Sequence, residues 1–173
     1  GSTAAFRWTE ATSAVPLTPV GGYGSTVANV VSADGSFIVG SSSGIGIPDG
    51  GTHAARWNEA GVATDLGDLA SGPIDAIAYD VSADGSVVVG QGAVESSSSV
   101  TGFVSEAFRW TEATGMQGLG FLGEGYVSSS ANEVSPDGVL VFGTTSWDYG
   151  TDVFVWDARS GMRPLVAVLA NEH

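Results

Sequence analysis

A short segment near the C-terminal end, TTSWDYGTD, carries side chains that could bind a ligand. It contains Trp147, Asp148, Tyr149 and Asp152. A flat aromatic ring can stack on the apolar face of a sugar, while carboxylates accept hydrogen bonds from hydroxyl groups or bind a cation. The segment is therefore a candidate binding site for a carbohydrate or another surface ligand. For these residues taken alone, the favoured interpretation is that Trp147 packs back onto the domain and the carboxylates only cap turns.

Candidates for catalysis are few. The chain has no cysteine, and His53 and His173 are its only histidines. No nucleophile elbow, zinc-binding HExxH sequence or phosphate-binding loop is present. His53 precedes the segment AARW at a predicted loop end, where we expect a polar surface residue. The protein is therefore predicted not to be an enzyme. The alternative is a glycan hydrolase that uses two carboxylates in catalysis.

Three aspartates share one local sequence. Asp34 and Asp84 lie in two copies of VSADGS, and Asp137 lies in VSPDGV. Each could bind calcium, but one carboxylate per turn is a poor site for an ion that needs six to eight oxygens. We therefore expect each of these aspartates to cap its turn. No cofactor or metal is expected, and calcium binding is the alternative. An Asp-Gly pair between apolar runs also predicts a two-residue hairpin turn with positive φ at both positions.

These aspartates and four tryptophans mark an internal repeat of roughly fifty residues. Each tryptophan is followed at the same short interval by a leucine, in the pairs Trp8 and Leu17, Trp57 and Leu66, Trp110 and Leu119, and Trp156 and Leu165. Apolar runs surround each Asp-Gly pair. The repeat therefore predicts a unit of four short antiparallel strands.

The second strand of each predicted unit is apolar at consecutive positions, so neighbouring units must cover both of its faces. Units that stack in this way form a β-propeller, and a β-solenoid is the alternative. Arg7, Arg56 and Arg109 occupy one repeat position, between residues that point to the opposite face. We expect them to join adjacent blades through carboxylates or strand-end carbonyl groups. Val155 replaces arginine in the last unit.

The fold prediction is thus an all-β, propeller-type array with about three and a half units in a single domain, residues 4–173. The half-unit covers residues 4–20, and the units cover about 25–70, 75–122 and 127–169. Residues 1–3 are expected to lie outside the domain, since Gly1-Ser2 resembles the remnant of a cleaved tag. The ring is expected to be incomplete or completed by a second chain. Open blade edges would then favour self-association.

Charge and hydropathy exclude several partners. The formal net charge is −14, with 19 acidic residues and five arginines, which argues against binding to nucleic acid. No apolar run is long enough to span a bilayer, so direct membrane insertion is not expected. The segments between the second and third strands vary in length (41–52, 91–106 and 144–152), and we expect them to form binding loops on the face opposite the Asp-Gly turns.

The phrases AFRWTEATGMQGLG and SSSANEVSPDGVLVFG resemble the HAF-type extracellular repeats of Gram-negative bacteria, from Ala4 to about Leu169. The resemblance implies a propeller-like fold, export and a cell-surface location, often within autotransporter passengers, and implies no catalytic residues. SPDG alone is also similar to TolB-type propeller repeats. The expected function is a non-catalytic surface, adhesion or scaffold module that binds a surface glycan or protein. A carbohydrate-binding or glycan-hydrolysing propeller and a self-assembling structural protomer are the alternatives.

Overall fold

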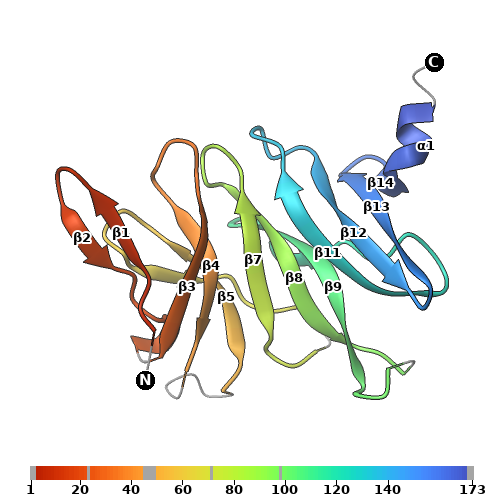
Figure 1. Cartoon of the computed structure of the whole chain (residues 1–173), viewed down its shortest axis with the longest axis horizontal. Coiled ribbons are helices and arrows are strands. Elements are labelled where there is room, and N and C mark those ends of the chain that lie inside the picture. Colours follow the sequence, from red (N-terminus) through yellow and green to blue (C-terminus); the bar gives the residue numbers. More distant parts are fainter. Residues whose placement is uncertain (1–2, 23, 45–49, 71, 98, 171–173) are drawn as a thin grey trace.

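The computed structural model describes residues 3–22, 24–44, 50–70, 72–97 and 99–170. In this part of the chain, fourteen strands form one two-stranded sheet and three four-stranded sheets. Every pairing within these sheets is antiparallel. The sheets stand side by side as a fan that runs from the N-terminus to the C-terminus (Figure 1). The predicted all-β architecture of four-stranded antiparallel units is therefore confirmed.

We call the two-stranded sheet the half-blade and the other sheets blades 1 to 3. The half-blade consists of β1 (Phe6–Thr9) and β2 (Ser13–Pro16), and the 3-10 helix η1 (Val20–Gly22) follows it. Blade 1 consists of β3 (Ser25–Val31), β4 (Ile38–Ser43), β5 (Thr52–Trp57) and β6 (Ala63–Asp65). Blade 2 consists of β7 (Ala76–Val81), β8 (Val87–Glu95), β9 (Phe103–Thr111) and β10 (Gly115–Gly118). Blade 3 consists of β11 (Tyr126–Val134), β12 (Val141–Trp147), β13 (Gly150–Asp157) and β14 (Gly161–Pro164), and the short helix α1 (Leu165–Ala170) follows it.

Strand order within each blade follows the chain, so neighbouring strands are joined by hairpins. Each repeated tryptophan lies on the third strand of a blade, or on the equivalent strand β1 of the half-blade. Thr3 belongs to this fold, since Thr26 N–H donates to the Thr3 carbonyl at 2.9 Å. Helix α1 was not predicted from the sequence.

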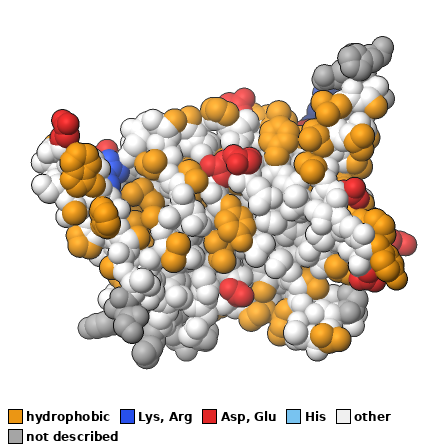
Figure 2. Space-filling view, in the orientation of Figure 1, with side chains coloured by type: hydrophobic (Ala, Val, Ile, Leu, Met, Phe, Trp, Pro, Cys, Tyr) orange, Lys and Arg blue, Asp and Glu red, His pale blue; other side chains and the backbone are white. Residues whose placement is uncertain are grey.

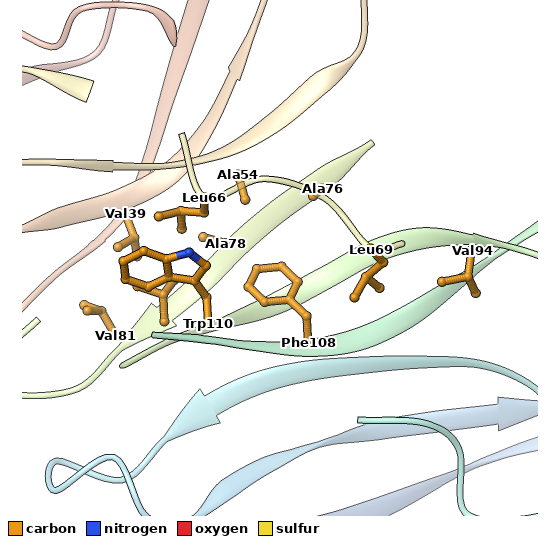
Figure 3. Close-up of a cluster of buried hydrophobic side chains, with 11 residues drawn as sticks. Val39, Ala54, Leu66, Leu69, Ala76, Ala78, Val81, Val94, Phe108 and Trp110 are labelled. Carbon is orange, nitrogen blue, oxygen red and sulfur yellow. The ribbon is translucent and has the colours of Figure 1, made fainter. Parts of the chain in front are cut away.

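The hydrophobic core lies between blades. Phe108 and Trp110 of blade 2 pack against Val39, Ala54 and Leu66 of blade 1 (Figure 3). Phe154 of blade 3 packs in the same way with Val89 and Ala107 of blade 2, and Trp57 of blade 1 packs with Leu17 of the half-blade. Each third strand therefore directs its aromatic residues toward the preceding unit, because side chains alternate along a strand.

The prediction that every second strand is covered on both faces is wrong for blade 3. Val87, Val88 and Val89 of blade 2 are all buried. In blade 3 the equivalent Leu140 is 36% exposed and Phe142 is half-buried. The reason is physical, since blade 3 has a neighbour on one side only within the described structure.

The predicted two-residue Asp-Gly turn is also incorrect. Ser32 N–H donates to the Phe37 carbonyl at 2.8 Å, so four residues lie in the connection. Gly35 has a φ of 77°, but Asp34 does not have positive φ. Asp34 instead closes the turn with Oδ1, which accepts hydrogen bonds from Ser32 Oγ at 2.6 Å and Ser36 N at 2.9 Å. A carboxylate that bonds to its own turn in this way favours this conformation.

These turns also connect the blades to one another. Asp34 N–H donates to the Ala83 carbonyl at 3.2 Å, and Ala83 N–H donates to the Pro136 carbonyl at 3.0 Å. The three turns therefore lie next to one another at one end of the blades, as Figure 1 shows for the connections β3–β4, β7–β8 and β11–β12. The repeated turn sequence thus closes each hairpin and also forms a contact with the turn of the next blade.

Acid should weaken the fold through these turn carboxylates. Hydrogen bonds from the Ser86 backbone and from the Ser82 and Ser86 side chains lower the pKa of Asp84 to about 2. An unfolded aspartate has a pKa of about 3.9, so the stabilisation is complete above that pH and is lost as the pH falls toward the folded value. We expect the free energy of unfolding to decrease between about pH 4 and pH 2, and to decrease less in Asp84→Asn. Urea unfolding at both pH values measures this difference.

The matched control is Asp148→Asn, which removes an exposed carboxylate outside the Asp-Gly turns. This variant should keep the pH dependence of the wild type. An equal pH dependence in Asp84→Asn and the wild type would show that the turn carboxylate does not stabilise the fold.

Candidate functional site

The candidate ligand-binding segment forms the tip of the hairpin between β12 and β13. Trp147 pairs with Gly150, so Asp148 and Tyr149 are the only residues of the turn. The segment 144–152, predicted as a loop, is therefore mostly strand. The same holds for 91–106, where β8 and β9 remain paired from Gln91 to Glu95. Residues 45–49 of the first predicted loop lie outside the described residues. A two-residue turn holds the site more rigidly than a long loop would.

The two aromatic residues of the hairpin tip contact each other. The ring centroids of Trp147 and Tyr149 are 5.9 Å apart, and their planes meet at 70° in an edge-to-face arrangement. Trp147 is 42% exposed and Tyr149 is 88% exposed. Gly150 lies against the Trp147 ring, since a Cβ atom there would be 3.2 Å from it. The indole is thus held against the hairpin backbone while much of its surface faces solvent.

Tyr126 adds a third aromatic residue, which is not among the four candidate ligand-binding residues predicted from the sequence. It begins β11 and lies directly opposite Trp147 in the pairing with β12. Its hydroxyl donates a hydrogen bond of 2.7 Å to Asp152 Oδ2, and this bond raises the pKa of Tyr126. One sequence signal could have identified it. Tyr126 and Trp147 lie at nearly equal distances before and after Asp137, so a hairpin centred on that turn must pair them.

We define the aromatic cluster as Tyr126, Trp147, Tyr149 and Asp152. The structure brings three of the predicted residues into it and places Asp148 exposed in the turn. The cluster offers exposed aromatic surface, a carboxylate and phenol hydroxyl groups. Such a set can stack on an apolar ring face and exchange hydrogen bonds with hydroxyl groups.

The repeated arginines form contacts between blades. Arg56 Nη1 donates to the Gly85 carbonyl of blade 2 at 2.9 Å, and its guanidinium lies 4.8 Å from the Trp110 ring centroid. Arg109 repeats this pattern toward blade 3, with Nη2 at 3.3 Å from the Gly138 carbonyl and the guanidinium 5.9 Å from the Trp156 ring. Burial lowers the pKa of both arginines. Arg7 lies half-buried on β1.

His53 differs from its predicted place on the surface. It lies on β5 and is only 7% exposed, and its Nδ1 is 2.9 Å from Asp65 Oδ2. His173 lies outside the described residues. In the described ranges, no three His, Cys, Asp or Glu side chains are placed to hold a metal ion together. Asp84 and Asp137 use Oδ1 to accept hydrogen bonds within their turns, as Asp34 does.

Three four-stranded antiparallel sheets, stacked face to face with their turns in contact, define a β-propeller-like array, and the described residues form no closed ring. The crystal structure of TolB from Acinetobacter baumannii is similar, with a TM-score of 0.57 and 15% sequence identity. The match covers 94% of this chain and 37% of that TolB chain, and TolB has a β-propeller as its C-terminal domain.

The sequence matches no protein-family model and no curated protein. None of the helices in the described residues has the length and apolar character needed to cross a bilayer.

Proposed function

We propose that this chain is a non-catalytic binding module of an exported surface or adhesion protein, and that its aromatic cluster binds carbohydrate. The exposed edge-to-face pair of Trp147 and Tyr149 carries this proposal. Exposed aromatic rings that are grouped at one place on a folded scaffold are typical of a recognition site.

The polar groups fit the same ligand class. Asp152 Oδ1 can accept a hydrogen bond while Oδ2 accepts from Tyr126, and the Tyr126 oxygen can itself accept one. A sugar supplies both apolar ring faces and hydroxyl donors, so it matches the aromatic surface and the acceptors together. The resemblance to HAF-type repeats supports export and a Gram-negative cell-surface location as part of this proposal.

A glycan array followed by calorimetric titration of its strongest soluble oligosaccharide tests the proposal. Trp147→Ala removes the stacking surface and should weaken binding at least about tenfold, which is a loss of about 1.4 kcal/mol. Tyr126→Phe keeps the ring but removes the hydroxyl, so a smaller loss is expected. Phe103→Ala is the control, since Phe103 is 40% exposed and lies at the β8–β9 hairpin.

Two results would contradict the proposal. The carbohydrate assignment fails if no glycan binds, or if Trp147→Ala binds as tightly as the wild type. Release of reducing sugar from the bound oligosaccharide, abolished by Asp152→Asn, would instead establish the hydrolytic alternative.

A further inference from the structure

The half-blade presents an aromatic face that whole blades bury. Phe6 and Trp8 are each 62% exposed. The equivalent Phe108 and Trp110 of blade 2 are 0% and 6% exposed, because they pack on blade 1. We call the surface formed by Phe6 and Trp8 the head face. Its exposure is a consequence of position in the array, since both segments share the phrase AFRWTEAT.

The opposite end of the array presents an aliphatic surface. Val153, Val166 and Leu169 are 48%, 75% and 55% exposed. They line a groove of about 360 Å³ with Leu165, Pro164, Thr151 and Asp152. We call this groove, together with exposed Leu140, the tail face. Figure 2 shows hydrophobic side chains at both ends of the molecule, over β1 at one end and over blade 3 and α1 at the other.

The two faces are the separate halves of an interface that the chain already forms internally. Val153 and Leu165 occupy the repeat positions of Ala54 and Leu66, which pack against Phe108 and Trp110 in the core between blades 1 and 2 (Figure 3). The tail face therefore corresponds to the surface of blade 1 in this contact, and the head face corresponds to the aromatic surface of blade 2 that packs on it.

We propose that a second copy of this chain docks its head face onto the tail face, with Phe6 and Trp8 against Val153 and Leu165. Aromatic anchors in an apolar groove are typical of the energetic centre of an interface. The contact is heterologous, because different surfaces meet, and it therefore builds either a ring or an open chain. This inference does not depend on the proposed carbohydrate site.

The number of units is compatible with a closed ring of two copies. Two chains joined at both ends would supply six whole blades and two half-blades, since each has three four-stranded sheets and one two-stranded sheet. That makes about eight positions, within the four to eight that propellers commonly have. The net charge of −14 on each copy opposes association, so added salt should strengthen it.

Analytical ultracentrifugation over about 1 to 200 µM protein, at low and high salt, tests the proposal. The wild type should associate in a concentration-dependent manner. Phe6→Ala with Trp8→Ala should weaken association at least about tenfold. The matched control is Val62→Ala with Val100→Ala, which removes exposed apolar side chains from hairpin connections and should associate as the wild type does. Circular dichroism verifies that each variant is folded.

Mixing two variants separates this contact from other modes of association. Val166→Asp with Leu169→Asp disables the tail face and leaves the head face intact. Alone, this variant and the Phe6→Ala, Trp8→Ala variant should each associate at least about tenfold more weakly than the wild type. Mixed, they should form a one-to-one complex, because one copy supplies a tail face and the other a head face.

Three outcomes would overturn the proposal. A wild type that stays monomeric at the highest concentration excludes a second copy as the occupant. Wild-type association of the Phe6→Ala, Trp8→Ala variant shows that another surface, such as the β1 edge, is responsible. A mixture of the two variants that remains monomeric shows that the contact is not head-to-tail.

Discussion

Replacing Trp57 with alanine is expected to lower the free energy of unfolding by about 3–5 kcal/mol. Trp57 is fully buried and packs with Leu17 and Ile38 between the half-blade and blade 1. Its Nε1 donates a hydrogen bond of 2.7 Å to the Thr18 carbonyl. The substitution leaves both a cavity and an unpaired carbonyl group. Urea unfolding at low protein concentration measures the difference from the wild type.

Trp8→Ala is the matched control, since Trp8 occupies the same repeat position but is 62% exposed. Its effect on the monomer should be within about 0.5 kcal/mol. The contrast between the two variants measures what an adjacent blade contributes to an otherwise identical strand. Similar losses in both would show that the interface between units does not stabilise the array.

The repeat made the fold predictable. The constant interval from tryptophan to leucine and the recurring Asp-Gly turn place the third strand and the first hairpin of each unit, as observed for β5, β9 and β13. Stacking followed from apolar residues at consecutive positions of the second strand. These features are local in sequence, and each occurs several times, so accidental patterns can be recognised and set aside.

Burial at the ends of the array could not be read from the same motifs. Ala5–Thr12 and Ala107–Thr114 have the same sequence, yet Phe6 is 62% exposed and Phe108 is 0% exposed. The local chemistry is equal, and only the presence of a preceding unit differs. Exposure is therefore a property of the assembly, and a repeat sequence alone does not specify it.

The candidate site likewise combines contacts that follow from the local sequence with contacts that depend on how the strands pair. Trp147 and Tyr149 are close in sequence, and their contact follows from a tight hairpin. The partner of Asp152 lies on β11 and depends on the register of two strand pairs. His53 was placed on the surface because its partner, Asp65, comes from a different strand. Polar residues are buried where a partner meets them, and such partners are often distant in sequence.

Gly90→Ala is expected to destabilise the fold by about 1–3 kcal/mol, although it adds only one methyl group. A Cβ atom at Gly90 would lie 2.0 Å from the Ile77 carbonyl oxygen and 2.8 Å from Phe108 Cε1. Ile77 lies just before a break in the register of β7 and β8, between Ala78 and Asp80. A Cβ atom at Gly40 or Gly143 would likewise lie 2.0 Å or 2.1 Å from a carbonyl oxygen of the preceding strand. The recurring glycine therefore leaves room for the bulge that bends each first strand.

Gly123→Ala is the control that separates the steric clash of a Cβ atom at Gly90 from the general effect of replacing a glycine. A Cβ atom at Gly123 would meet no other atom within 4 Å, and its φ is not positive. Its stability should therefore stay within about 0.5 kcal/mol of the wild type. Urea unfolding of both variants provides the comparison. Equal stability of Gly90→Ala and Gly123→Ala would mean that the first strand can move away from its neighbour without loss, and that the glycine is not required by the bulge.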